Sequence, residues 1–169
     1  GSLPAVTTLL IAGMHVGDAG ASAIAAALDR GALPRLESLA LAGAAIGDAG
    51  VVALAPALWR RPALETLGLF CNPFGDEGLA ALVAPPPADA PPPQAEALAQ
   101  LKVLDLGQSQ ITDAGCAYLA SRLRSGALPA LVPYALGLSD ISASNAAILV
   151  VYEAHDDVHR WEEDDEAGE

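Results

Sequence analysis

The sequence predicts an α/β solenoid made of about five repeats, each a short strand followed by a helix. One phrase recurs along the chain, beginning near residues 6, 36, 64, 101 and 131. A recurrence of about 29 residues is typical of solenoids, whose units bury their apolar edges only by stacking on their neighbours. Each copy also joins a stretch of alternating leucines to an alanine-rich stretch. These two patterns predict a strand and a helix in every unit.

The strand half is clearest in residues 36–41, which read Leu-Glu-Ser-Leu-Ala-Leu. Alternation at period two suits a short strand with one buried face. Residues 6–11, 64–69 and 101–106 follow the same pattern, and residues 131–136 form a degraded fifth copy. Pro133 falls inside this last copy. Proline cannot donate to a strand ladder, so we expect that strand to lie at an edge.

The helix half is represented by residues 48–58. Alanine is the strongest helix former, and Val51, Leu54 and Leu58 share one helix face. An aspartate stands where each of the first four helices should begin. An aspartate there accepts a hydrogen bond from an otherwise unpaired N–H and complements the helix dipole. These residues are Asp18, Asp48, Asp76 and Asp113.

The combined motif, Leu-x-x-Leu-x-Leu-x-x-x-x-Ile-Gly-Asp-x-Gly followed by an alanine- and leucine-rich helix, resembles a leucine-rich repeat of the ribonuclease-inhibitor type. The resemblance covers residues 3–155. It implies a right-handed, curved α/β horseshoe with a parallel inner sheet and outer helices. The family places Asn or Cys three residues after the last strand leucine, to bond the loop backbone. Only Asn72 matches, so we expect looser loops at the other copies, which carry Met14, Ala44, Ser109 and Ser139.

We divide the chain into a repeat domain, residues 3–152, and an acidic C-terminal tail, residues 153–169. The proline-rich insert, residues 85–93, is expected to loop out between the third helix and the fourth strand. Residues 146–152 suit a final helix better than an added strand. Gly1-Ser2 resembles a cloning remnant, and no polar cap precedes the first repeat. We therefore expect a fragment of a longer protein, because solenoids normally need capped ends.

Charge and hydropathy limit the classes of partner. The net charge is −13, and residues 153–169 hold nine acidic residues against one arginine. Such a block is expected to be solvated, and it disfavours nucleic acid, whose phosphates it would repel. No uncharged apolar run is long enough to predict a membrane-spanning helix. Cys71 and Cys116 lack the spacing of a zinc site or a disulfide framework. We expect them to be reduced, in an intracellular and cytoplasmic protein.

No motif for catalysis is visible. The sequence lacks a glycine-rich phosphate loop, a nucleophile elbow and a Cys-His pairing, so neither an enzyme nor a cofactor is predicted. His155 and His159 would share one helix face, but no third ligand is fixed by spacing, and no metal site is predicted. Trp59 is expected to cover a helix end. Arg60 and Arg61 would match a helix dipole or form an exposed pair for an acidic partner.

The predicted function is a non-enzymatic protein–protein interaction module or scaffold, whose partner and oligomeric state the sequence leaves open. Solenoids of this type bind through the concave face lined by their strands. Phe70 is the expected anchor on that face, unless it packs beside Pro73 or Phe74. The residues predicted to bind the partner are Leu10, Ser38, Thr66, Phe70, Asn72, Val103 and Asp105.

Two alternatives remain from the sequence. One is a regulator of a small GTPase, because Ran-type GTPase-activating proteins resemble this repeat family and act through polar residues at the strand–loop rim. That rim would hold Asn72, Gln108, Ser109 and Gln110 but no arginine. The other is a structural subunit of a larger assembly.

Overall fold

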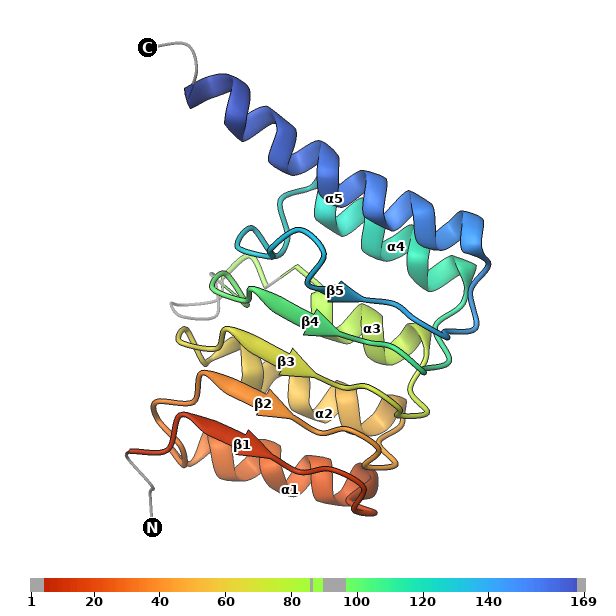
Figure 1. Ribbon diagram of the computed structural model, residues 1–169. Coiled ribbons are helices and arrows are strands. Elements are labelled where there is room, and N and C mark those ends of the chain that lie inside the picture. Colours follow the sequence, from red (N-terminus) through yellow and green to blue (C-terminus); the bar gives the residue numbers. More distant parts are fainter. Residues whose placement is uncertain (1–4, 86, 90–96, 167–169) are drawn as a thin grey trace.

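The computed structural model describes residues 5–85, 87–89 and 97–166, and in these residues five strands alternate with five helices (Figure 1). The strands are short and the first four helices have 8 to 13 residues. In chain order the elements are β1 (Thr8–Leu10), α1 (Gly17–Asp29), β2 (Ser38–Ala40), α2 (Asp48–Trp59), β3 (Thr66–Gly68), α3 (Asp76–Val83), β4 (Val103–Asp105), α4 (Asp113–Arg124), β5 (Leu136–Gly137) and α5 (Asn145–Glu166). The alternation confirms the predicted strand-plus-helix repeat.

The strands form one parallel sheet in the order β1-β2-β3-β4-β5. Their central leucines lie in register and point toward the helices, and those of β2, β3 and β4 are completely buried. A continuous apolar seam therefore joins all five repeats, as the leucine pattern predicts. Its members are Leu9, Leu39, Leu67, Leu104 and Leu136.

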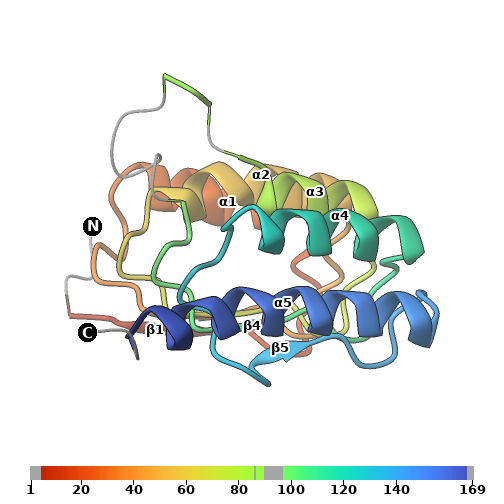
Figure 2. The same cartoon turned by 90° about the horizontal axis from the view of Figure 1, so that it is seen from above.

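Helices α1 to α4 lie on one side of the sheet (Figure 2). Helices α1 to α4 stack beside one another, and α5 packs against α4 at the C-terminal end (Figures 1 and 2). Their buried faces close over the leucine seam, so the apolar core lies between helices and sheet. Among the described residues, no helix covers the other face of the sheet, which is available to a partner.

The fifth repeat departs from the predicted register. Of residues 131–136 only Leu136 belongs to the strand, which has two residues, and Leu136 pairs with Leu104. Pro133 and Tyr134 lie in a turn before it, where the N–H of Ala135 donates to the carbonyl of Val132 over 3.0 Å. Because proline has no N–H to give to the ladder, the chain turns at this point instead of extending.

The C-terminal segment also differs from expectation. Residues 146–152 are helical, as the sequence favours, but α5 continues through the acidic residues to Glu166. Val151, Ala154 and His155 share one helix face and are all buried. Burial thus continues beyond residue 152, and the helix carries part of the supposed tail with it. No described helix is long and apolar enough to cross a membrane.

The proline-rich insert is described in part. Helix α3 ends at Val83, close to the predicted end, and residues 85 and 87–89 are exposed. Residue 86 and residues 90–93 of the insert lie outside the described residues.

Candidate protein-interaction surface

The uncovered side of the sheet, which we name the open sheet face, consists of the outward-pointing strand residues. These alternate with the central leucines, so each of β1 to β4 contributes its first and last residue. Most of these side chains are small, and only that of Asp105 carries a charge. The open sheet face comprises Thr8, Leu10, Ser38, Ala40, Thr66, Gly68, Val103 and Asp105.

Exposure varies along this face. Leu10 is 68% exposed and Val103 is 37% exposed, which makes them its large apolar members. Ser38 and Thr66 lie between them and are half-buried. A surface of this composition can dock an apolar or mixed protein surface.

Phe70 follows β3 and does not protrude as expected of an anchor. Its side chain is half-buried, and a Cβ built on Gly107 would lie 3.1 Å from its Cδ2 atom. The ring therefore rests on the glycine of the next repeat, whereas Phe74 is part of the core. Asp105 is also partly engaged, because one of its carboxylate oxygens accepts from the N–H of Gly107 over 3.0 Å.

Asn72 has a structural role inside the loops and cannot touch a partner. Its side chain is 2% exposed. The amide oxygen accepts from the N–H groups of Ala44 and Ile46, each over 3.0 Å. The amide nitrogen donates to the carbonyls of Leu41 and Leu69, over 2.6 and 2.9 Å. We therefore remove Asn72 from the proposed binding residues. It does bond the loop backbone, as the resemblance implies for this position.

The GTPase-regulator alternative requires a rim of exposed polar residues, and part of that rim is buried. Ser109 is 5% exposed, so two of the four rim residues are buried. Gln108 and Gln110 remain exposed.

The aspartates at the helix starts connect consecutive repeats. Each carboxylate accepts hydrogen bonds from the start of the following helix, not from its own, which corrects the simple capping prediction. Asp18 accepts from the N–H groups of Gly47 and Gly50, over 2.7 and 3.0 Å. Asp76 accepts from the N–H and the hydroxyl of Thr112, over 2.8 and 2.6 Å. These bonds satisfy helix N-terminal groups that would otherwise lack a partner.

The same link explains the last glycine of the motif in the second, third and fourth repeats, which is Gly50, Gly78 or Gly115. A Cβ on Gly50 would lie 2.6 Å from a carboxylate oxygen of Asp18, and one on Gly115 would lie 2.2 Å from that of Asp76. Only glycine leaves room for the neighbouring carboxylate. Sequence reasoning identified the motif but not that its two halves meet across the repeat boundary.

The other ends of the helices are also linked across repeats. Trp59 Nε1 donates to the carbonyl of Leu82 over 3.0 Å, which confirms its predicted place at a helix end. Arg61 donates to the carbonyl of Leu28, and Arg60 pairs with Asp29. The two arginines therefore serve the end of α1 and are not a free pair for an acidic partner.

Two titratable residues, His155 and Cys116, are buried in the core. Nε2 of His155 lies 2.9 Å from the carbonyl oxygen of Leu131, and the ring is buried. Burial and, to a smaller extent, the carboxylates of Asp113 and Asp76 together raise the pKa of Cys116 to about 11. Both cysteines are free thiols, and the described residues contain no His, Cys, Asp and Glu cluster that could hold a metal ion.

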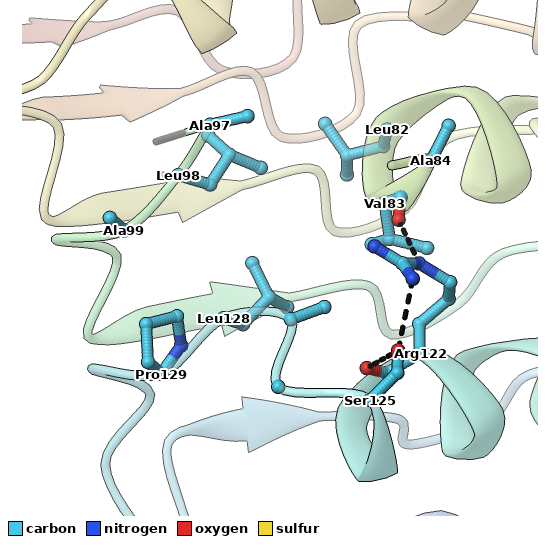
Figure 3. Close-up of a pocket in the computed structure, with 12 residues that line it drawn as sticks. Leu82, Val83, Ala84, Ala97, Leu98, Ala99, Arg122, Ser125, Leu128 and Pro129 are labelled. Carbon is cyan, nitrogen blue, oxygen red and sulfur yellow. Dashed lines mark hydrogen bonds between the residues drawn. The ribbon is translucent and has the colours of Figure 1, made fainter. Parts of the chain in front are cut away.

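A cavity of about 220 Å³ lies beyond the end of α3 (Figure 3). Leu82, Leu98 and Leu128 give it an apolar lining, and Arg122 stands at one side. Nε of Arg122 donates to the carbonyl of Val83 over 2.8 Å, and a second nitrogen donates to the hydroxyl of Ser125 over 2.9 Å. The guanidinium thus ties α4 to the end of the shorter α3, which is the role that this geometry supports.

Comparisons with known proteins agree with this architecture. A family model described as Leucine Rich repeat matches residues 33–55, 62–83 and 98–120. Among solved structures, the chain is similar to "Leiomodin-1 Actin-Binding Site 2 (ABS2)", with a TM-score of 0.55 and 14% sequence identity. The alignment covers 98% of this chain and 89% of that one. No curated protein matches the sequence. Leucine-rich repeats are therefore present, and the fold is a leucine-rich-repeat solenoid.

Proposed function

We propose that this protein is a non-enzymatic interaction module that binds a protein partner through the open sheet face. The observation that carries the proposal is the asymmetry of the solenoid: helices cover one side of the sheet, and small, nearly uncharged side chains line the other. Exposed apolar surface that the fold itself does not bury often marks a contact site for a partner. Leu10 and Val103 provide such area at the two ends of this face.

The binding residues that we retain are Leu10, Ser38, Thr66, Phe70, Val103 and Asp105, with Phe70 as a half-buried contributor. The similarity to an actin-binding site of leiomodin-1 supports a protein-binding use of this fold. At 14% identity it does not transfer the actin partner. We also propose the ribonuclease-inhibitor-like subgroup, supported by repeats that pair one strand with one full helix. The free cysteines support the proposed intracellular, cytoplasmic location.

The experiment uses matched pairs of substitutions on the two sides of the sheet. Val103→Glu alters the open sheet face, and Val52→Glu alters an α2 position of nearly equal exposure, 37% against 40%. Leu10→Glu and Leu149→Glu form a second pair, at 68% and 59% exposure. Each variant is used as bait in an affinity purification, with partners quantified by mass spectrometry. Circular dichroism checks that the variants fold.

We expect one set of partners to be retained by the two helix-side variants and lost by the two open-face variants. Loss with the helix-side variants alone would contradict the proposal, because it would place the contact on the helices.

A further inference from the structure

We propose that a pocket at the C-terminal end of the solenoid binds a lysine side chain presented by a basic segment of a protein partner. The pocket has a volume of about 280 Å³. It lies between the turn before β5 and one face of α5, away from the centre of the open sheet face. Its lining residues are Tyr134, Leu136, Tyr152, His155 and Asp156. The inference does not depend on the function proposed above.

Tyr134 lines the pocket on the side of the turn before β5. Its side chain is 100% exposed, and its backbone has a φ of 66°. Most other non-glycine residues with positive φ recur at equivalent turns of the repeats, such as Leu33, Leu98 and Leu128. Tyr134 has no such counterpart, because it stands in the irregular entry to the fifth strand. A bulky residue in this strained region, with no burial in return, suggests a role outside the fold.

Helix α5 forms the opposite wall. Tyr152, His155 and Asp156 are spaced three and four residues apart, so they lie on one face of the helix. The hydroxyl of Tyr152 donates to the carbonyl of Leu136 over 3.3 Å, which fixes its ring beside the strand. Burial raises the pKa of Tyr152, so its ring is a neutral phenol at neutral pH.

The lining suits a lysine side chain in three respects. Two tyrosine rings, those of Tyr134 and Tyr152, line the pocket, and the face of such a ring attracts an ammonium group through its quadrupole. Leu136 offers apolar contact to the lysine stem. Asp156 adds a carboxylate to the lining; its side chain is 62% exposed, and its Oδ1 lies 3.9 Å from Nδ1 of His155. An ammonium group held between ring faces and a carboxylate would be paired on both sides.

Charge complementarity points to a basic segment. The part of α5 that lines the pocket carries three exposed acidic residues, Glu153, Asp156 and Asp157. Lys102, whose carbonyl accepts from the N–H of Val132 near the pocket, has its ammonium 3.1 Å from a carboxylate oxygen of Glu65. The ammonium of that lysine is thereby paired with the carboxylate of Glu65. Electrostatic attraction would bring a basic partner to this end of the solenoid and raise its rate of association.

The test uses the full chain and two synthetic peptides, acetyl-Gly-Ser-Lys-Ser-Gly-amide and the same peptide with norleucine in place of lysine. Amide chemical shifts are followed by two-dimensional NMR during titration. We expect the lysine peptide to shift residues 134–136 and 152–156, and the norleucine peptide to leave them unchanged. Equal shifts with both peptides, or shifts confined to the open sheet face, would overturn the proposal.

Variants distinguish binding of the peptide in the pocket from a general electrostatic attraction to acidic residues. Tyr134→Ala should weaken the lysine peptide between about two- and fivefold, whereas Tyr134→Phe, which keeps the ring, should bind like the wild type. Asp156→Asn should weaken binding more than Asp140→Asn, which removes the same charge from an exposed loop residue that tolerates asparagine. Equal losses in the two asparagine variants, or full binding by Tyr134→Ala, would reject the site. The peptide titration is independent of whether Val103→Glu loses partners in the affinity purification, because Val103 does not line this pocket.

Discussion

Asp48 and Gly78 belong to consecutive repeats, and Oδ1 of Asp48 accepts a hydrogen bond from the N–H of Gly78 over 2.7 Å. The same oxygen accepts from the N–H of Gly75 over 2.8 Å. One carboxylate thus holds two N-terminal groups of α3, at a position that no side chain of α3 itself caps. Stacking of the repeats depends on this link as well as on the leucine seam.

Removal of this carboxylate should destabilise the fold. We expect Asp48→Ala to lower the free energy of unfolding by about 1–3 kcal/mol, because two N–H groups lose their partner in a partly buried position. Urea denaturation followed by circular dichroism measures the change. Asp89→Ala, at an exposed aspartate, is the control and should have almost no effect. Equal effects of the two substitutions would show that the link contributes nothing.

Gly78→Ala tests the other half of the same contact. Alanine favours a helix by about 1 kcal/mol over glycine, so a free site would be stabilised. Here the new Cβ would lie 2.9 Å from Oδ1 of Asp48 and 3.1 Å from Cβ of Val51. We therefore expect a net destabilisation of about 1–2 kcal/mol.

A double-mutant cycle locates the cause of that loss. In the Asp48→Ala background the carboxylate is gone, so Gly78→Ala should cost about 1 kcal/mol less than it does in the wild type. Strictly additive losses in urea denaturation would mean that the two residues do not interact.

The sequence predicted the parts of this arrangement better than their connections. Leucine alternation identified the strands, because a period of two is a property of the strand itself and does not depend on how the repeats stack. The aspartates were placed correctly at the helix starts, but local capping rules assign such a side chain to its own helix. The N–H groups that donate to these carboxylates belong to the next repeat, about 30 residues away, and only the stacking distance between repeats decides the choice. Arg60 and Arg61 likewise bond to residues of the preceding repeat, at the C-terminal end of α1.

The C-terminal region was less predictable for a different reason. Charge alone suggested that residues after 152 are solvated, yet Ala154 and His155 complete the buried face of α5. Pro133 was identified as unusual, but its effect, a shifted strand and an exposed Tyr134, depends on how the chain regains register with β4. The partner-binding prediction for Asn72 missed that its amide can satisfy two loops at once.

Asn72 should be one of the most sensitive polar residues of the fold. Asn72→Ala leaves buried N–H and carbonyl groups of two repeats without partners, and we expect a loss of about 2–4 kcal/mol in the free energy of unfolding. Asn145→Ala, at the exposed start of α5, is the matched control and should cost less than about 1 kcal/mol. Thermal and urea unfolding would compare them. A small effect at Asn72 would contradict its assigned role.

Cys116 should make stability fall at alkaline pH. Its pKa is about 11 in the folded chain, above the ordinary value of 9.0, because burial disfavours the thiolate. The unfolded state therefore loses this proton first, and its stabilising contribution, present below pH 9, is lost as the pH rises toward 11. We expect the free energy of unfolding to drop by about 1.4 kcal/mol for each pH unit in this window, relative to Cys116→Ala. Identical pH profiles of the two proteins would refute the assignment.

The reactivity of the two thiols offers a separate check. Cys71 is exposed and should react with a thiol reagent at pH 8 in the folded protein, whereas Cys116 should react only after unfolding. Mass spectrometry of the labelled peptides distinguishes them. Rapid labelling of Cys116 in the native protein would contradict its burial.

The use of the open sheet face is tested most directly by calorimetric titration of the captured partner into purified Val103→Glu and Val52→Glu. The two valines have almost the same exposure but lie on opposite sides of the sheet. A buried charge within a contact should reduce affinity at least about tenfold for Val103→Glu, while Val52→Glu should bind like the wild type. Unchanged affinity for Val103→Glu, or an equal loss in both variants, would contradict binding through this face.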